Sequence, residues 1–116
     1  MATIKIKRAY EPEEQTDGSR ILVDGLWPRG IKKEDLHVGV WLKEIAPSAT
    51  LRRWFNHDVD KWIDFKNRYN AELMHSGAVD RVLELMKKHK TLTLVYSAKD
   101  ELHNQAIVIK EFLEKS

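Results

Sequence analysis

The stretch Thr91-Leu92-Thr93-Leu94-Val95-Tyr96 decides the fold of this 116-residue chain. Its apolar and β-branched residues leave little room for a polar face, which is typical of a central strand in a parallel sheet. The run ends abruptly at Ser97-Ala98-Lys99-Asp100, where polar and charged residues take over. We therefore predict a central strand over residues 91–96 that is followed by a polar loop.

A second apolar run, Ile21-Leu22-Val23, ends in the same way, at Asp24-Gly25-Leu26-Trp27-Pro28-Arg29-Gly30. It predicts a strand over residues 21–24. In open α/β sheets, ligands bind just beyond the carboxyl ends of such strands. If the two strands run the same way, the polar side chains that follow them converge in one crevice, namely Asp24, Arg29, Lys99, Asp100, His103 and Asn104.

Two further segments bear on the sheet. Residues 3–8 alternate apolar and basic side chains, which predicts a strand at an edge of the sheet or with one exposed face. The connection from this strand to residues 21–24 is about as short as a parallel crossover permits, so the mutual orientation of the two strands stays open. Residues 38–45 fit either a strand or an irregular packed segment.

Four segments carry helical signals. Ser48 is the predicted N-cap of the first helix, and residues 78–88 form the third. Over residues 59–73, one apolar stripe is predicted to face the core, formed by Trp62, Phe65, Tyr69 and Leu73. The last helix is predicted from Asp100, its N-cap, to about residue 114. One apolar face of this helix comprises Leu102, Ala106, Ile109 and Leu113.

Size and composition indicate a single globular domain over residues 1–116. Hydrophobic residues make up 42% of the chain and charged residues 33%, which argues against disorder. Because apolar runs alternate with helical patterns, we predict an α/β fold. The expected architecture is a small three-layer α/β/α domain with a short, mainly parallel central sheet of about three strands.

Charge and residue content argue against several classes of function. The net charge of +2, without a basic stripe, does not indicate nucleic-acid binding. No stretch approaches the roughly 20 apolar residues of a membrane span, and residues 1–8 lack the apolar core of a signal peptide. Cysteine is absent and the histidines do not have the spacing of metal ligands, so no metal site is predicted. The residues identify neither a cofactor nor an oligomeric state.

The residues beyond the strand ends suggest an anion site with acid–base chemistry. A helix that begins at Asp100 would offer the free N–H groups of its first turn to an anion, and Lys99 adds a positive charge there. Arg29 can grip an anionic group. Asp24 and His103 can act as acid–base residues, or Asp24 can orient the His103 ring.

Each of these residues also has a purely structural interpretation. Asp100 can be only a helix cap, and Asp24 can form an ion pair with Arg29 that fixes the shape of the loop. Ser97 is a conceivable nucleophile, but it lacks the Gly-x-Ser-x-Gly setting of a nucleophile elbow. The chain is therefore an enzyme or a ligand-binding protein with a pocket at this edge, or an interaction protein. In the last case a partner would contact the region of Trp27, Trp41 and Trp54.

Several short motifs, spread over nearly the whole chain, carry a family resemblance. They are Lys7-Arg8-Ala9-Tyr10, Asp17-Gly18, Arg20-Ile21-Leu22-Val23-Asp24, Leu26-Trp27-Pro28-Arg29-Gly30-Ile31, Trp41, Ala46-Pro47-Ser48, Leu51-Arg52, Phe55, and Leu94-Val95-Tyr96-Ser97-Ala98-Lys99 with His103-Asn104. In these motifs the chain resembles the YeaO-like family, which is domain of unknown function family 488. The resemblance implies a compact α/β domain of cytoplasmic proteins and supplies no catalytic residues.

The chain departs from the family pattern at Gly25, where the resemblance implies an arginine. A ligand contact made by that arginine in relatives is either lost here or made instead by Arg8, Arg20 or Lys99. The sequence thus predicts a pocket for a phosphate-bearing or other anionic small molecule. Its predicted ligand-binding residues are Arg8, Arg29, Lys99, Asp100 and Asn104. Acid–base chemistry by Asp24 and His103 is a hypothesis, and a non-catalytic ligand-binding or protein-interaction domain is the alternative.

Overall fold

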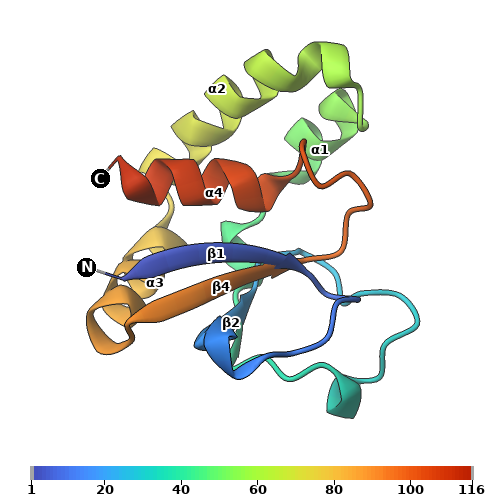
Figure 1. The fold of residues 1–116 in the computed structure, drawn as a ribbon. Helices are drawn as coiled ribbons and strands as arrows, with labels where there is room; N and C mark the ends of the chain where they lie inside the picture. Colours follow the sequence, from blue (N-terminus) through green and yellow to red (C-terminus); the bar gives the residue numbers. More distant parts are fainter. Residues whose placement is uncertain (1, 116) are drawn as a thin grey trace.

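A computed structural model describes residues 2–115, so Met1 and Ser116 of the predicted domain lie outside the described residues. The chain forms an α/β domain around a four-stranded sheet in the order β1-β4-β2-β3 (Figure 1). The strands are β1 (Thr3–Arg8), β2 (Ser19–Leu22), β3 (Val40–Trp41) and β4 (Thr91–Tyr96). The predicted central strand over residues 91–96 and the edge position of residues 3–8 are both confirmed.

All strand pairs in the sheet are parallel. β1 and β2 each pair with β4, which lies between them, and this settles the orientation that the sequence left open. β2 spans Ser19–Leu22 rather than the predicted residues 21–24, because Ser19 and Arg20 also pair with β4 and the pairing ends at Leu22. The sheet gains a fourth strand where the sequence was ambiguous, since Val40 and Trp41 form a short β3 beside β2.

Four α-helices accompany the sheet, and short 3-10 turns connect the elements. The helices are α1 (Ala49–Phe55), α2 (Trp62–Met74), α3 (Gly77–Lys88) and α4 (Gln105–Glu114). The 3-10 turns are Gln15–Asp17, Lys33–Asp35, Lys43–Ile45 and Val59–Lys61. Ser48 caps α1 as predicted, since its hydroxyl accepts a hydrogen bond from the Leu51 N–H at 3.1 Å.

The predicted start of the last helix at Asp100 is wrong. α4 begins at Gln105, because Asn104 has an extended backbone and its side chain accepts a hydrogen bond from the Ile107 N–H at 3.1 Å. Residues 101–104 form a bend before the helix, and Leu102 within it is 74% exposed instead of facing the core. The first turn of α4 therefore lies beyond the polar loop that follows β4.

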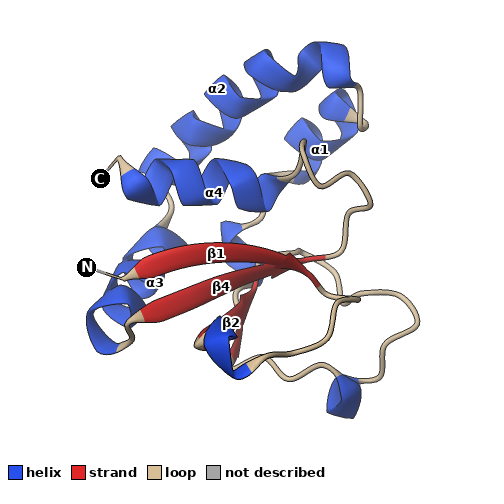
Figure 2. Ribbon diagram, in the orientation of Figure 1, coloured by secondary structure: helices blue, strands red, loops and turns tan. Residues whose placement is uncertain are grey.

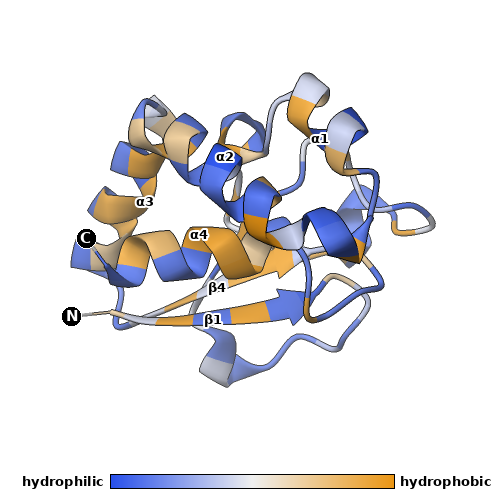
Figure 3. Cartoon of the chain, turned by 90° about the horizontal axis from the view of Figure 1, so that it is seen from above, coloured by the Kyte–Doolittle hydropathy of each residue, from blue (hydrophilic) through white to orange (hydrophobic). Residues whose placement is uncertain are grey.

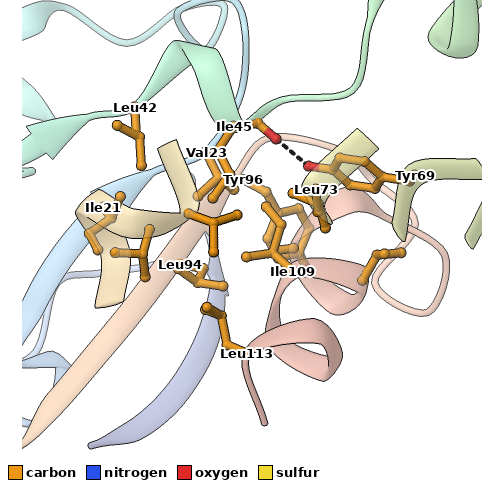
Figure 4. Packing of buried hydrophobic residues seen from close by; sticks show 14 of the residues in the cluster. Ile21, Val23, Leu42, Ile45, Tyr69, Leu73, Leu94, Tyr96, Ile109 and Leu113 are labelled. Atoms are coloured by element: carbon orange, nitrogen blue, oxygen red, sulfur yellow. Dashed lines mark hydrogen bonds between the residues drawn. The ribbon is translucent and has the colours of Figure 1, made fainter. Parts of the chain in front are cut away.

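The main core fills the space between one face of the sheet and the helices. Phe65, Tyr69 and Leu73 of the predicted stripe are buried, and Trp62 packs beside them half-buried. The Tyr69 hydroxyl donates a hydrogen bond to the Ile45 carbonyl at 2.6 Å, which satisfies the polar end of a buried ring (Figure 4). α4 presents many apolar residues and runs over β1 and β4 (Figure 3).

The opposite face of the sheet is covered by loops and short 3-10 turns (Figure 2). A second apolar cluster lies there, formed by Ala9, Leu22, Leu36 and Val95 with Trp27, Ile31, Val38 and Trp41 packed against it. The rings of Trp27 and Trp41 meet edge to face at 5.4 Å. These contacts hold the loop after β2 against the sheet.

Asp17 lies on this second face and is fully buried, at 0% exposure. Its carboxylate forms ion pairs with Lys7 at 2.9 Å and with Arg20 at 2.5 Å. Its backbone carbonyl accepts a hydrogen bond from the Thr93 hydroxyl at 2.7 Å. Burial alone would raise the pKa of Asp17, but the hydrogen bonds from Lys7, the Glu14 backbone and Arg20 outweigh it and lower that pKa. Asp17 thus joins β1 and β2 through its ion pairs with Lys7 and Arg20, and β4 through its hydrogen bond with Thr93.

Gly18 is required by the close approach of β4. Its φ is +64°, and a Cβ atom there would lie 2.3 Å from the carbonyl oxygen of Thr91. We expect Gly18→Ala to lower the free energy of unfolding by about 2–4 kcal/mol, combining backbone strain with overpacking. Urea denaturation measures this loss. Gly77→Ala is the matched control, since a Cβ at Gly77 meets nothing within 4 Å. Equal stability of both variants would contradict the prediction.

Candidate active or binding site

A cleft of about 700 Å³ opens at the carboxyl ends of β2 and β4. We call it the strand-end cleft; it lies at the edge of the sheet where the arrowheads of β1 and β4 end in Figure 1. Residues of the loops after β2 and β4 line it, together with residues of α1 and α2. Its polar lining comprises Asp24, Arg29, Arg52, His57, Ser97, Lys99, Asp100, His103, Asn104 and Gln105. Its apolar lining includes Leu26, Trp27, Pro47, Phe55 and Phe65.

Asp24 forms part of the floor of the strand-end cleft, two residues beyond the end of β2 at Leu22. One carboxylate oxygen, Oδ2, accepts hydrogen bonds from the Ser97 N–H at 2.9 Å and from the Ser97 hydroxyl at 2.6 Å. The other, Oδ1, accepts a hydrogen bond from the side-chain amide of Gln105. The backbone carbonyl of Asp24 accepts from the Trp41 indole at 2.7 Å. Asp24 therefore connects the ends of both central strands with α4.

Burial dominates the ionisation of Asp24. It raises the pKa of this carboxyl, because the surroundings disfavour a negative charge. The hydrogen bonds from Ser97 and the positive charge of Arg52 act in the opposite direction without outweighing burial. Asp24 thus differs from Asp17, whose pKa is lowered by its cationic neighbours.

His103 contacts Asp100 rather than Asp24. Its Nδ1 lies 3.0 Å from Asp100 Oδ2, and its ring meets Trp62 edge to face at 5.2 Å. Asp100 Oδ1 accepts hydrogen bonds from the N–H groups of Leu102 at 2.9 Å and His103 at 3.1 Å. The bond from the Leu102 backbone and the contact with His103 lower the pKa of Asp100. Asp100 thus stabilises the bend after β4 and orients the His103 ring.

The other predicted residues differ in how they contribute to the cleft. Arg29 and Lys99 line it with exposed side chains, and no ion pair joins Arg29 to Asp24 within residues 2–115. Asn104 is buried. Its side-chain N–H donates a hydrogen bond to the Asp100 carbonyl, and its side-chain oxygen accepts one from the Ile107 N–H at the start of α4. Arg8 lies outside the lining, where its Nε donates a hydrogen bond to the Ala98 carbonyl at 2.9 Å. Arg8 therefore supports the loop after β4.

The structure adds Arg52 and Gln105 to the site, and it gives Ser97, which the sequence offered as a conceivable nucleophile, the role of a hydrogen-bond donor to Asp24. Arg52 comes from α1 and reaches Gly25, where a Cβ atom would lie 3.4 Å from its Nη1. It is this arginine, and not Arg20, that occupies the space beside Gly25, since Arg20 is paired with Asp17 on the other face. Ser97 stands out in the sequence because it directly follows the central strand. The spacing of residues does not place Arg52 or Gln105 at the cleft, because only the packing of α1 and α4 brings them there.

Two further features of the described residues bear on function. Within residues 2–115, no group of three or more His, Asp or Glu side chains is arranged to hold a metal ion. No helix in the same range has the length and hydropathy that a membrane span requires.

Comparisons with known proteins agree with the resemblance in the sequence motifs. The family model described as the inactive DUF488-N3 subclade matches residues 3–116. The uncharacterized protein YeaO of Escherichia coli is 49% identical over 111 residues, which cover 95% of this chain and 96% of that protein. The uncharacterized protein Mb3100c of Mycobacterium bovis is 36% identical over 110 residues, covering 95% and 92%. No solved structure matches the chain. The chain therefore belongs to the DUF488 family, in the subclade described as inactive DUF488-N3.

Proposed function

We propose that the strand-end cleft binds a small molecule that carries a phosphate or another anionic group, and that it does so without turnover. The observation that carries this proposal is a set of three cationic side chains on one cleft. Arg29, Arg52 and Lys99 line it, and within residues 2–115 none of them forms an ion pair with a carboxylate. Unpaired cations that converge on a concave surface favour an anionic ligand.

The apolar lining supports the same proposal. Trp27, Phe55 and Phe65 form part of the apolar wall of the cleft, and the Ser97 hydroxyl lies beside Asp24. Small-molecule sites combine such apolar walls with a few polar groups that fix the orientation of the ligand. A cytoplasmic location, which the resemblance to the family implies, gives such a cleft access to phosphorylated metabolites.

Acid–base chemistry by Asp24 and His103 is the second candidate function. Burial raises the pKa of Asp24, which is a property of many general acids. Two features favour binding without turnover. The oxygens of Asp24 already accept hydrogen bonds from Ser97 and Gln105, and the matching family model is described as inactive.

Titration with inorganic phosphate at constant ionic strength tests the proposal. Phosphate is expected to raise the melting temperature, because a ligand that binds only the folded state stabilises it by mass action. Arg52→Ala and Lys99→Ala should each weaken binding about 10-fold, as expected for the loss of one charge-assisted contact. Arg53→Ala is the matched control, because Arg53 neighbours Arg52 on α1 but does not line the cleft. Equal affinities of all variants would refute an anion site here.

A further inference from the structure

Asp24 is a buried carboxylate that has no cation at ion-pair distance among the described residues. It is 6% exposed, and within residues 2–115 no lysine, arginine or histidine nitrogen forms an ion pair with it. Asp17, which is also buried, differs in this respect, because Lys7 and Arg20 both form ion pairs with it. Burying a charge is costly unless a partner compensates it. The missing partner of Asp24 therefore requires an explanation.

The hydrogen bonds to Asp24 leave room for one more donor. A carboxylate has about four acceptor positions on its two oxygens. Three are filled by neutral donors: the N–H and hydroxyl of Ser97 on Oδ2, and the amide of Gln105 on Oδ1. The position that remains is on Oδ1, and Asp24 lines the strand-end cleft. A molecule bound in the cleft can thus supply the remaining donor to a buried carboxylate with which no cation of residues 2–115 forms an ion pair.

We propose that the ligand of the strand-end cleft is a zwitterion whose ammonium group pairs with Asp24 while its anionic group is bound by Arg52, Lys99 and Arg29. The inference rests on the proposed function, because the cations hold the anionic half. It also resolves an apparent conflict, since an anion alone would be repelled by the negative charge of Asp24. A ligand with both charges compensates the carboxylate on the floor and the cations around it.

The ionisation of Asp24 supports this assignment. Burial raises the pKa of the free carboxyl, and an ammonium group at Oδ1 would lower it again, because an opposite charge stabilises the ionised form. The positive charge of Arg52 acts on Asp24 from beyond ion-pair distance. The position beside the Asp24 carboxylate is therefore open to a cationic group of the ligand.

Two phosphate esters of the same length separate the two halves of the ligand. Phosphoethanolamine carries an ammonium group where propyl phosphate carries a methyl group, so their comparison isolates the contact with Asp24. We expect isothermal titration calorimetry to show that phosphoethanolamine binds about 10-fold more tightly than propyl phosphate. In the Asp24→Asn variant this preference should disappear, while propyl phosphate should bind at least as tightly as before.

Asp64→Asn is the control for the change in net charge, because Asp64 is an exposed residue of α2 outside the cleft. It should keep the 10-fold preference. Equal affinity of the unmodified chain for the two esters would overturn the zwitterion and leave the anion site standing, and this comparison holds even if Asp24→Asn does not fold. A preference that survives in a folded Asp24→Asn variant would also overturn the role of Asp24. Failure of both esters to bind would refute the proposed function itself.

Discussion

Replacement of Asp17 by alanine is expected to lower the free energy of unfolding by about 3–5 kcal/mol, the usual loss when one partner of a buried ion pair is removed. The variant leaves Lys7 and Arg20 without the carboxylate that pairs with both. Arg20 is itself buried, so its charge would remain in the interior without compensation. Urea denaturation measures the loss, and Asp64→Ala, at an exposed position, should change stability by less than about 0.5 kcal/mol.

The contribution of Asp17 to the free energy of unfolding should decrease at acid pH. Its pKa in the folded chain is lowered from the ordinary value of 3.8. A lowered pKa adds stability that is fully present above the pKa of the unfolded chain and is lost as pH falls through the folded value. The difference in stability between the unmodified chain and Asp17→Ala should therefore be constant near neutral pH and shrink below pH 3.8. A difference that grows in acid would show that the carboxylate is not held in its ionised form.

Replacement of Phe65 by alanine is expected to cost about 3–5 kcal/mol, the usual range for a buried phenylalanine. Phe65 is 3% exposed and stacks on Phe55 at a ring distance of 4.2 Å. It also contacts the ring of Tyr69 at 5.7 Å, so its removal opens a cavity between α1 and α2. Denaturant titration gives the magnitude.

Ile63 provides the control for Phe65, because it lies on the same helix and is 66% exposed. Ile63→Ala should change the free energy of unfolding by less than about 0.5 kcal/mol. A loss below about 1 kcal/mol for Phe65→Ala would mean that the aromatic stripe does not form the core between these helices.

Most of the sheet could be predicted because each of its three longer strands contains a short apolar run or an apolar–basic alternation. Residues 91–96 and 21–23 stand out as apolar runs, and β1 shows the alternation of an edge strand. The start of β2 could not be read in this way, because Arg20 is buried only through its pair with Asp17. The start of α4 was misplaced, since Asp100 and Asn104 are both good caps and only the backbone of the bend decides between them.

The location of the cleft was also accessible from the sequence. Asp24, Lys99 and His103 follow parallel strands that are neighbours in the sheet, and all three line the cleft. Their partners were less accessible. The Asp100–His103 contact spans three residues and is local, whereas Arg52 reaches the cleft only through the docking of α1. The spacing of residues along the chain does not reveal which distant segments come into contact in the fold.

The order of strands in the sheet determines when the sheet can form during synthesis of the chain on the ribosome. β4 lies between β1 and β2, so β1 has no strand to pair with until residues 91–96 have been synthesised. Before that point, β2 can pair only with the two residues of β3. The sheet therefore cannot grow one hairpin at a time as the nascent chain emerges.

Such a chain must close long loops before its pairing contacts stabilise it, which makes folding slow compared with a helical bundle of the same size. Until β4 arrives, β1 and β2 expose unpaired edges that can associate with other chains. A nascent chain that stops before residue 91 lacks the strand that joins its sheet together. Folding of this protein is therefore a late event in translation, and chaperones that shield unpaired strands should bind the incomplete chain and not the finished one.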